Sequence, residues 1–470
     1  MKNIVGREDE IRSIEKYYYS GRPELVIIYG RRRVGKTYLI REIFENNFSF
    51  YFTGSIDASN STNLANFDTE IMACGGDVQT KSKNWSDAFE KLKNLLNKNK
   101  GARKVVFIDE MPWLDAHKSD FLSAFDYFWN SWASANPDIF FIGCGSATAW
   151  ITKHIFQNRG GLHNRVTGRI YLAPFTIGEC ELFFERMGVI ITRYQLAECY
   201  MIFGGIPYYL SLFEKGLSFS QNVDKLCFAP NAPLKNEFEE LYHSLFKNPL
   251  HHIKIVETLT AKKSGMTRKD LCDTGGLQEN GHLTRALKEL EQCGFIESFS
   301  DFTKKKSGTF YFLKDAFTLF YIRYIRNNNT KDMYFWTNYA EDGGHRAWSG
   351  YAFELLCRIH LSKIKEKLGI SGVSTNTATW RSKDSTPSVQ IDLLVSRRDG
   401  VVNLCEIKYS KHPYKITKDY GEKLEYRKMV FAMETGCKHA LHTTMITTFG
   451  LTKNGYFGAA QSEVTLDDLF

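Results

Sequence analysis

The sequence predicts an α/β protein that begins with a parallel sheet and a phosphate-binding loop and continues into further domains. Three observations carry this prediction. An apolar run at residues 25–29 leads into Gly-Arg-Arg-Arg-Val-Gly-Lys-Thr at residues 30–37, and a segment with helical spacing follows. A second apolar run, at residues 104–108, ends in two acids, as expected for a buried parallel strand whose carboxyl end binds a ligand. At 470 residues the chain exceeds one ordinary core, so we expect about two to four domains.

The loop at residues 30–37 matches the P-loop pattern, in which two glycines precede a lysine and a hydroxyl residue. Glycines let backbone N–H groups turn inward around phosphates, and the following helix points its positive end at them. A glycine turn that matches by chance is the alternative, and the strand and helix on its flanks argue against it. We therefore expect an ATP and Mg²⁺ site. Its predicted residues are Gly30, Arg33, Val34, Gly35, Lys36 and Thr37, with Lys36 on the β- and γ-phosphates and Thr37 on Mg²⁺.

The two acids after the second apolar run fit a Walker B strand. Asp109 is expected to hold Mg²⁺ through water, and Glu110 to polarise the water that attacks the γ-phosphate. A buried strand followed by an acidic helix cap would look the same. Its combination with a P-loop favours the catalytic interpretation.

A further predicted strand, at residues 139–146, ends in small polar residues, and we expect its last residue, Ser146, beside the γ-phosphate. Thr148 is a second candidate for this role, and an N-cap for the next helix is an equally good explanation of either residue. Arg165 and Arg169 are candidate arginine fingers. A structural pair with a nearby carboxylate is at least as good an explanation for both arginines.

Composition sets broad limits. The hydrophobic content of 43% and charged content of 24% are typical of a globular protein, and the net charge of +8 permits nucleic acid as a partner without requiring it. The ten cysteines form no C-x-x-C pair, which indicates neither a zinc site nor a disulfide framework. No apolar run approaches the roughly 18 residues of a membrane helix, and the first residues include acids where a signal peptide is apolar. We expect a cytoplasmic protein with no membrane partner.

The middle of the chain predicts a winged helix. Three helical patterns, at residues 251–262, 267–271 and 281–290, precede two alternating strands at 294–299 and 308–313. In a DNA-binding interpretation the third helix enters the groove of the DNA, and the lysines between the strands bind its phosphate groups. A structural joint with solvated lysines is the alternative, and it stays open because the third helix also carries Glu289 and Glu291. The candidate DNA-binding residues are His282, Arg285, Lys288, Lys304, Lys305 and Lys306.

The last third contains acids in a helix and two strands. Glu354 lies on a predicted helix, Asp392 in an apolar strand, and Glu406 and Lys408 in the strand that returns after Asp399-Gly400. The period of two puts Glu406 and Lys408 on one strand face, and the hairpin brings Asp392 alongside. Such a group suits one or two Mg²⁺ ions that activate water, with Asp392 and Glu406 as metal ligands and Lys408 positioning or deprotonating the water. A fold that only binds, with its charges satisfied by salt bridges, is the alternative.

Two resemblances follow from these motifs. Gly6-Arg7-Glu8, residues 30–37, 108–114 and 145–146, and Phe-Gly-Gly-Ile-Pro-Tyr-Tyr-Leu at 203–210 resemble the archaeal-type ATPases of the STAND/AAA-like P-loop proteins, over roughly residues 1–230. The resemblance implies a parallel-sheet core, a helical lid, and the Gly-Gly-x-Pro segment near the nucleotide, although an ordinary helix-breaking turn also explains that segment.

The C-terminal acids resemble the PD-(D/E)xK nuclease core in the DUF234 form that follows such ATPases. The resemblance implies a restriction-endonuclease-like α/β domain, with its positions filled by Glu354, Asp392, Glu406 and Lys408. The chain departs from the pattern in having Gln390-Ile391 before Asp392 rather than a proline.

We therefore expect an ATPase core at residues 1–175, a helical lid at 176–245, a winged helix at 246–335 and a nuclease-like domain at 336–470. The predicted function is an ATP-hydrolysing switch that binds DNA and cleaves it with Mg²⁺, and that forms a homo-oligomer when ATP is bound. The alternative is a STAND-type regulatory ATPase whose later domains bind nucleic acid or protein without cutting. No sequence feature favours a third possibility, an ATPase that remodels proteins.

Overall fold

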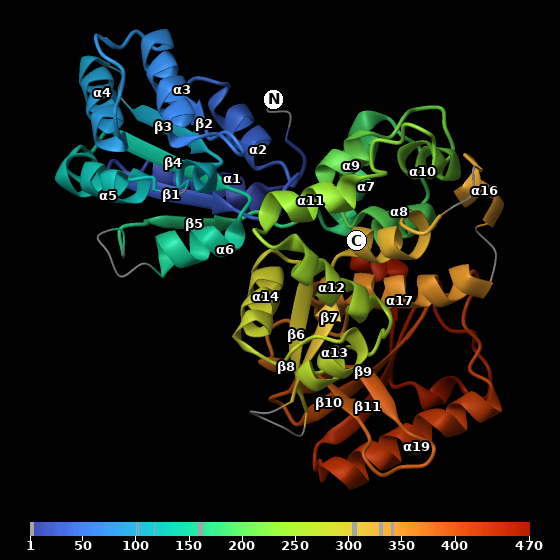
Figure 1. Ribbon diagram of the computed structural model, residues 1–470. Helices are drawn as coiled ribbons and strands as arrows, with labels where there is room; N and C mark the ends of the chain where they lie inside the picture. Colours follow the sequence, from blue (N-terminus) through green and yellow to red (C-terminus); the bar gives the residue numbers. More distant parts are fainter. Residues whose placement is uncertain are drawn as a thin grey trace. The chain divides into compact units, whose positions relative to one another are not determined.

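The computed structural model describes residues 4–99, 101, 103–116, 118–157, 162, 164–302, 308–328, 332–339 and 343–470. These residues fall into two compact units, Met1–Pro174 and Phe175–Phe470 (Figure 1). No helix within the described ranges has both the length and the apolar character needed to cross a membrane. All ten cysteines are free thiols.

The first unit is built on five parallel strands in the order β2-β3-β4-β1-β5. Because the strands are parallel, their carboxyl ends meet at one edge of the sheet, where ligands bind in open α/β folds. The predicted P-loop follows β1, the predicted acids close and follow β3, and Ser146 follows β4. The strands are β1 (Glu24–Tyr29), β2 (Phe50–Thr53), β3 (Lys104–Asp109), β4 (Ile139–Gly145) and β5 (Gly168–Tyr171).

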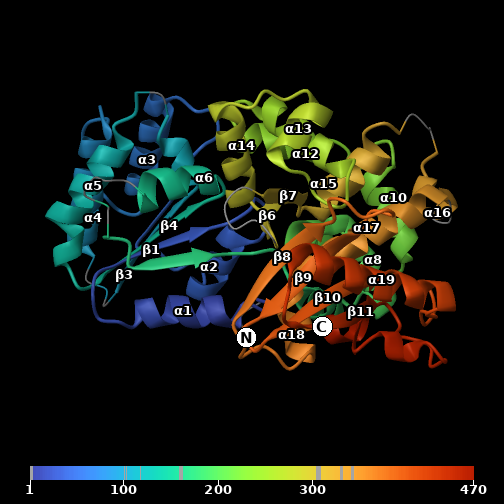
Figure 2. The same ribbon diagram turned by 90° about the horizontal axis from the view of Figure 1, so that it is seen from below.

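Helices cover both faces of this sheet (Figure 2). On one face α1 and α2 pack against Phe140, through Tyr18 and Phe44. On the other, α3, α4 and α5 pack over the neighbouring Phe141 in one apolar core. The helices are α1 (Glu8–Tyr18), α2 (Lys36–Phe44), α3 (Asn60–Ala73), α4 (Trp85–Lys98), η1 (Met111–Leu114), α5 (Phe121–Ser131), η2 (Ala133–Ala135), α6 (Thr148–Ile151) and η3 (Thr152–Phe156).

The second unit begins with helices and continues into the three helices and hairpin of a winged helix. Thr267 caps α13 through a reciprocal pair of hydrogen bonds with Asp270, as its position in the sequence predicts. The helices are α7 (Ile177–Met187), α8 (Arg193–Phe203), α9 (Pro207–Ser211), α10 (Phe219–Cys227), α11 (Glu237–Leu245), α12 (Pro249–Thr260), α13 (Arg268–Gly275) and α14 (Gly281–Gln292). The hairpin is β6 (Ile296–Asp301) and β7 (Thr309–Leu313), which pair antiparallel.

The second unit contains a mixed sheet of seven strands, in the order β12-β11-β10-β9-β8-β6-β7. The winged-helix hairpin is part of this sheet, because Ser300 and Asp301 of β6 pair with Ala378 and Thr379 of β8. The remaining elements are α15 (Ala316–Phe320), η4 (Tyr321–Ile325), α16 (Phe335–Tyr339), α17 (Gly343–Ile359), α18 (Leu361–Lys367), β8 (Thr375–Arg381), β9 (Gln390–Arg397), β10 (Val401–Lys408), α19 (Lys418–Thr435), β11 (Ala440–Thr447), η5 (Phe457–Ala459), β12 (Ser462–Thr465) and η6 (Leu466–Leu469).

The two faces of β10 meet different helices. Val402 and Leu404 share a core with Val430 and Phe431 of α19. Tyr409, which follows β10 with the opposite parity, packs its ring against Phe353 of α17 at 5.4 Å between ring centroids. The even-numbered residues of β10 therefore face α19, and this places Glu406 and Lys408 on the α19 side.

Candidate nucleotide site and C-terminal motif residues

The loop after β1 has the backbone geometry of a phosphate cradle. Gly30 and Gly35 have φ of 150° and 90°, and Arg33 has φ of 71°. A Cβ atom at Gly30 would lie 2.3 Å from the carbonyl oxygen of Leu172, so only glycine fits there. Val34 is buried, as is Arg31, whereas Arg32 and Arg33 are half-buried.

Lys36 is folded onto the loop. Its Nζ donates to the carbonyl oxygens of Gly30 and Arg31, at 3.0 and 2.9 Å, and to Ser146 Oγ at 3.0 Å. The side chain is buried, with 5% of its surface exposed. A buried ammonium surrounded by oxygen acceptors is ready to exchange them for phosphate oxygens.

Thr37 and Asp109 bring two oxygen ligands together at the start of α2. Thr37 Oγ1 donates to Asp109 Oδ2 at 2.5 Å, and Asp109 is buried. Mg²⁺ prefers one or two such oxygens together with substrate phosphates, so this pair fits the metal predicted for the site. Burial, and after it the neighbouring Asp109 carboxylate, raises the pKa of the Cys144 thiol well above its usual value, so this thiol stays neutral.

Glu110 is tied to Ser146. The hydroxyl of Ser146 donates to Glu110 Oε1 at 2.6 Å, and its backbone N–H donates to Glu110 Oε2 at 3.2 Å. Glu110 itself has a left-handed backbone, with φ of 47°, directly after β3. The hydroxyl of Ser146 therefore connects the predicted phosphate-binding lysine to the predicted water-polarising glutamate. Thr148 contacts the backbone of Ser146: its hydroxyl donates to the Ser146 carbonyl oxygen at 3.5 Å.

The two candidate arginine fingers are both exposed. Arg169 lies on the edge strand β5, and its guanidinium stacks 4.5 Å from the ring centroid of Phe156. Arg165 lies in the turn before β5. Their role as fingers stays a prediction.

The third helix of the winged helix exposes two cations and a histidine. His282, Arg285 and Lys288 are exposed on α14, while Leu283, Leu287 and Leu290 are buried beneath them. Glu289 contacts His252 of α12, whose Nε2 lies 2.8 Å from Glu289 Oε2. Glu291 accepts a hydrogen bond from Ser298 of β6. Lys304, Lys305 and Lys306 lie outside the described residues.

Glu406 is the centre of a polar cluster on the α19 side of β10. It forms an ion pair with Arg427 and accepts a hydrogen bond from the Tyr420 hydroxyl at 2.9 Å. Lys408 Nζ lies 3.7 Å from Glu406 Oε2 and 5.2 Å from the ring centroid of Tyr420. Burial, and after it the Glu406 carboxylate, raises the pKa of Tyr420, so its hydroxyl remains a donor.

The other two C-terminal residues are placed differently. Glu354 is buried on α17 and forms an ion pair with Lys263, from the segment between α12 and α13, at 2.8 Å. Asp392 lies on β9, beside the register pair Leu393–Cys405, and its side chain lies outside the described structure. Within the described residues, no three His, Cys, Asp or Glu side chains are grouped so as to hold a metal ion. The convergence of Glu354, Asp392 and Glu406 therefore stays a prediction.

Sequence reasoning missed the partners of these acids. Arg427 and Tyr420 lie seven residues apart on α19, a spacing that places them on one helix face. This spacing is the only feature of the sequence that could have indicated them as partners of Glu406. Lys263 gives no such signal, because its contact with Glu354 joins residues far apart in the chain.

The parallel sheet, the P-loop and the acids of β3 define a P-loop ATPase core. Residues 4–213 match a family described as an ATPase domain predominantly from Archaea. This stretch of the chain is therefore similar to an ATPase domain of the archaeal type, and the match extends past the first unit into the helices of the second.

Two relatives come from Methanocaldococcus jannaschii. An uncharacterized protein is 28% identical over 328 residues, which are 69% of this chain and 69% of the relative. An uncharacterized ATP-binding protein is 45% identical over 43 residues, 9% of this chain and 73% of the relative. Among solved structures, a Walker-type ATPase of Pyrococcus abyssi aligns with a TM-score of 0.50 at 16% identity and covers 68% of this chain and 97% of that one. At that identity the likeness shows the fold alone.

Proposed function

We propose that the first unit binds ATP with Mg²⁺ and hydrolyses it. The observation that carries this proposal is the convergence of five side chains at one edge of the sheet. The Thr37 hydroxyl donates to Asp109 Oδ2 at 2.5 Å. The Ser146 hydroxyl accepts a hydrogen bond from Lys36 and donates one to Glu110. Bound Mg²⁺ supplies charge neutralisation for the phosphates.

The residues at this edge of the sheet have separate roles in binding and hydrolysis. Lys36 exchanges its three present acceptors for phosphate oxygens, and the N–H groups of the loop bind the remaining phosphate charge. Glu110 is placed to orient water and to accept its proton, and Ser146 fixes the direction of the Glu110 carboxylate.

Two variants test this proposal. We expect Lys36→Ala to lose ATP binding. We expect Glu110→Gln to retain binding and to lose about 10²-fold or more in phosphate release, the usual effect of removing a general base. Lys16→Ala, an exposed lysine on α1, is the matched control. Unchanged ATP turnover in Lys36→Ala would contradict the assignment of the P-loop.

We infer that DNA is the partner of the second unit. The support is the outer face of α14, where Arg285 and Lys288 are exposed while Glu289 and Glu291 are held by His252 and Ser298. Arg285 and Lys288 present positive charge on this face to a phosphate backbone. A role as a structural joint would leave these two cations without effect on binding.

Salt dependence separates these two roles. We expect Arg285→Ala and Lys288→Ala each to weaken binding of a short DNA duplex, and each to reduce the slope of log K against log salt by about 1. Lys235→Ala, an exposed lysine between α10 and α11, is the control. Equal affinities and slopes for all three variants would exclude α14 as the contact.

Cleavage of the bound DNA is a second candidate function. It is favoured by Glu406 and Lys408, which share one face of β10 beside the strand that carries Asp392. The described side chains do not fit a metal as they stand, because the Glu406 oxygens bind Arg427 and Tyr420. The competing proposal is a regulatory ATPase whose second unit binds nucleic acid or protein without cutting. We also propose that the chain self-associates when ATP is bound.

Incubation of plasmid and single-stranded DNA with the protein, Mg²⁺ or Mn²⁺ and ATP decides between the two. Metal-dependent cleavage that Lys408→Ala and Asp392→Ala abolish would establish a nuclease. Binding without cleavage in every nucleotide state would establish the regulatory alternative.

A further inference from the structure

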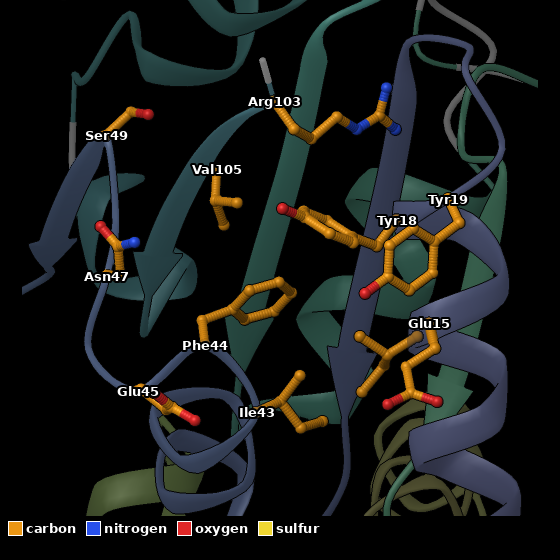
Figure 3. Close-up of a pocket in the computed structure, with 11 residues that line it drawn as sticks. Glu15, Tyr18, Tyr19, Ile43, Phe44, Glu45, Asn47, Ser49, Arg103 and Val105 are labelled. Carbon is orange, nitrogen blue, oxygen red and sulfur yellow. The ribbon is translucent and has the colours of Figure 1, made fainter. Parts of the chain in front are cut away.

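A pocket of about 250 Å³ lies in the first unit at the opposite end of the sheet from the P-loop (Figure 3). It opens where α1 and α2 both end, next to the start of β3. Its lining residues are Ile14, Glu15, Tyr18, Tyr19, Ile43, Phe44, Glu45, Asn47, Ser49, Arg103 and Val105. The volume is below the roughly 300–1,000 Å³ of drug-sized sites, so a ligand must be small.

The charges around the pocket favour a cation. Glu15 comes from α1 and Glu45 from the end of α2, on opposite sides of the pocket. The carboxyl ends of α1 and α2 add partial negative charge, because the last carbonyl groups of a helix have no partner within it. The Arg103 guanidinium lies at the far side of the pocket from these carboxylates. It donates to the carbonyl oxygens of Tyr17 and Pro137 and stacks on Phe140, and these contacts hold it at that side.

Aromatic rings form the wall between the two carboxylates. The ring of Tyr18 meets Tyr19 and Phe44 edge to face, at 4.9 and 5.4 Å between centroids. Tyr19 is 78% exposed, so its ring is accessible from solvent. Aromatic faces attract organic cations and also bind methylene groups.

From this arrangement we propose that the pocket binds a linear aliphatic diamine. One ammonium lies at Glu15 and the other at Glu45, and the methylene chain crosses the rings of Tyr18, Tyr19 and Phe44. The site uses none of the P-loop residues, so it is independent of the function proposed for the nucleotide site.

Calorimetric titration of the full chain, without nucleotide, tests the proposal with putrescine, n-butylammonium and n-butanol as probes. We expect putrescine to bind with a Kd of about 1 mM or tighter, n-butylammonium to bind at least about fivefold more weakly, and n-butanol not to bind. Added NaCl should weaken putrescine binding, because both contacts are between charges.

Two exposed positions provide variants that leave the core intact. Glu45→Gln and Tyr19→Ala should each weaken putrescine binding about two- to fivefold, the effect expected for removal of one exposed ion pair or one cation–π contact. Glu90→Gln, an exposed acid on α4, is the control, and equal urea midpoints verify folding. Binding of n-butanol as tight as that of putrescine, no binding of putrescine, or unchanged affinity in both variants would each overturn the proposal.

Discussion

The hydroxyl group of Ser146 is the point where the two predicted catalytic residues of the ATPase core meet. It accepts from Lys36 at 3.0 Å and donates to Glu110 at 2.6 Å. Only the sheet order places these residues together, since β4 lies between β1 and β3. A phosphate group that draws Lys36 away therefore also changes the environment of Glu110.

Gly205 provides a prediction at the same scale. Its φ is 68°, and a Cβ atom there would lie 2.2 Å from the carbonyl oxygen of Phe175. Gly276 has nearly the same φ, 63°, with open space around it. We expect Gly276→Ala to cost about 1 kcal/mol from the left-handed backbone alone, and Gly205→Ala about 2 kcal/mol more from the clash. Urea unfolding of both variants measures the difference, and equal midpoints would contradict the reason given for Gly205.

His360 gives a pH-dependent prediction. Its Nε2 accepts from the N–H of Ile177 at 2.9 Å, and Nδ1 faces the carbonyl oxygen of Leu356 at 2.9 Å. Burial lowers the pKa of His360 to about 4. The unfolded chain therefore binds an extra proton between its usual pKa of about 6.5 and the folded value of about 4. This stability is fully present above pH 6.5 and is lost as the pH falls towards 4.

The measurement is the free energy of unfolding as a function of pH, for the natural chain and for His360→Gln. We expect the natural chain to lose about 3 kcal/mol more than the variant between pH 6.5 and 4, as the pKa difference implies. Parallel pH profiles for the two proteins would contradict the assignment of this titration to His360.

At the scale of single elements, local sequence sets where many helices begin. Helices α7, α8, α10 and α13 each start with a reciprocal capping box, in which a Ser or Thr side chain and a Glu, Gln or Asp three residues later bond each other's backbone N–H. These starts depend on residues that are neighbours in the chain, so a sequence can specify them.

Thr267 at the start of α13 is a test of this argument. We expect Thr267→Ala to destabilise the second unit by about 1 kcal/mol, because the N–H of Asp270 loses its acceptor. Thr267→Ser should recover most of the loss, since it keeps the hydroxyl. Thermal unfolding measures both, and an Ala variant as stable as the Ser variant would contradict the capping role.

At the scale of the whole molecule, the winged helix and the C-terminal part share one sheet and buried ion pairs. Arg358 of α17 donates to Glu297 of β6 at 3.1 Å and stacks on Phe312 of β7, with only 1% of its side chain exposed. Phe302, which follows β6, packs on Phe431 of α19. We therefore expect the second unit to unfold in one cooperative transition.

The pair Arg358–Glu297 tests that cooperativity. Glu297→Ala leaves a buried cation without its carboxylate, and we expect a loss of about 3–5 kcal/mol. The double variant Glu297→Ala/Arg358→Met should recover much of that loss, because it removes the stranded charge as well. Calorimetry should show a single transition of the second unit that moves as a whole. Separate transitions for the winged helix and for the C-terminal sheet would contradict the shared core.

The sequence by itself determined the elements and motifs that depend on near neighbours. The P-loop between β1 and α2, the acids closing and following β3, the three helices and hairpin of the winged helix, and the helix–strand–strand order of Glu354, Asp392 and Glu406 are all readable from spacing and periodicity. The four-domain division and the nuclease assignment stay predictions.

Only the tertiary structure decided which partner each charged side chain has. It pairs Glu354 with Lys263, Glu406 with Arg427, and Glu289 with His252. It also joins β6 to β8 across the predicted domain boundary and forms the pocket between the ends of α1 and α2. These contacts link residues far apart in the chain. Such pairs have no helical or strand period, so the sequence does not indicate which lysine, arginine or histidine lies beside a given carboxylate.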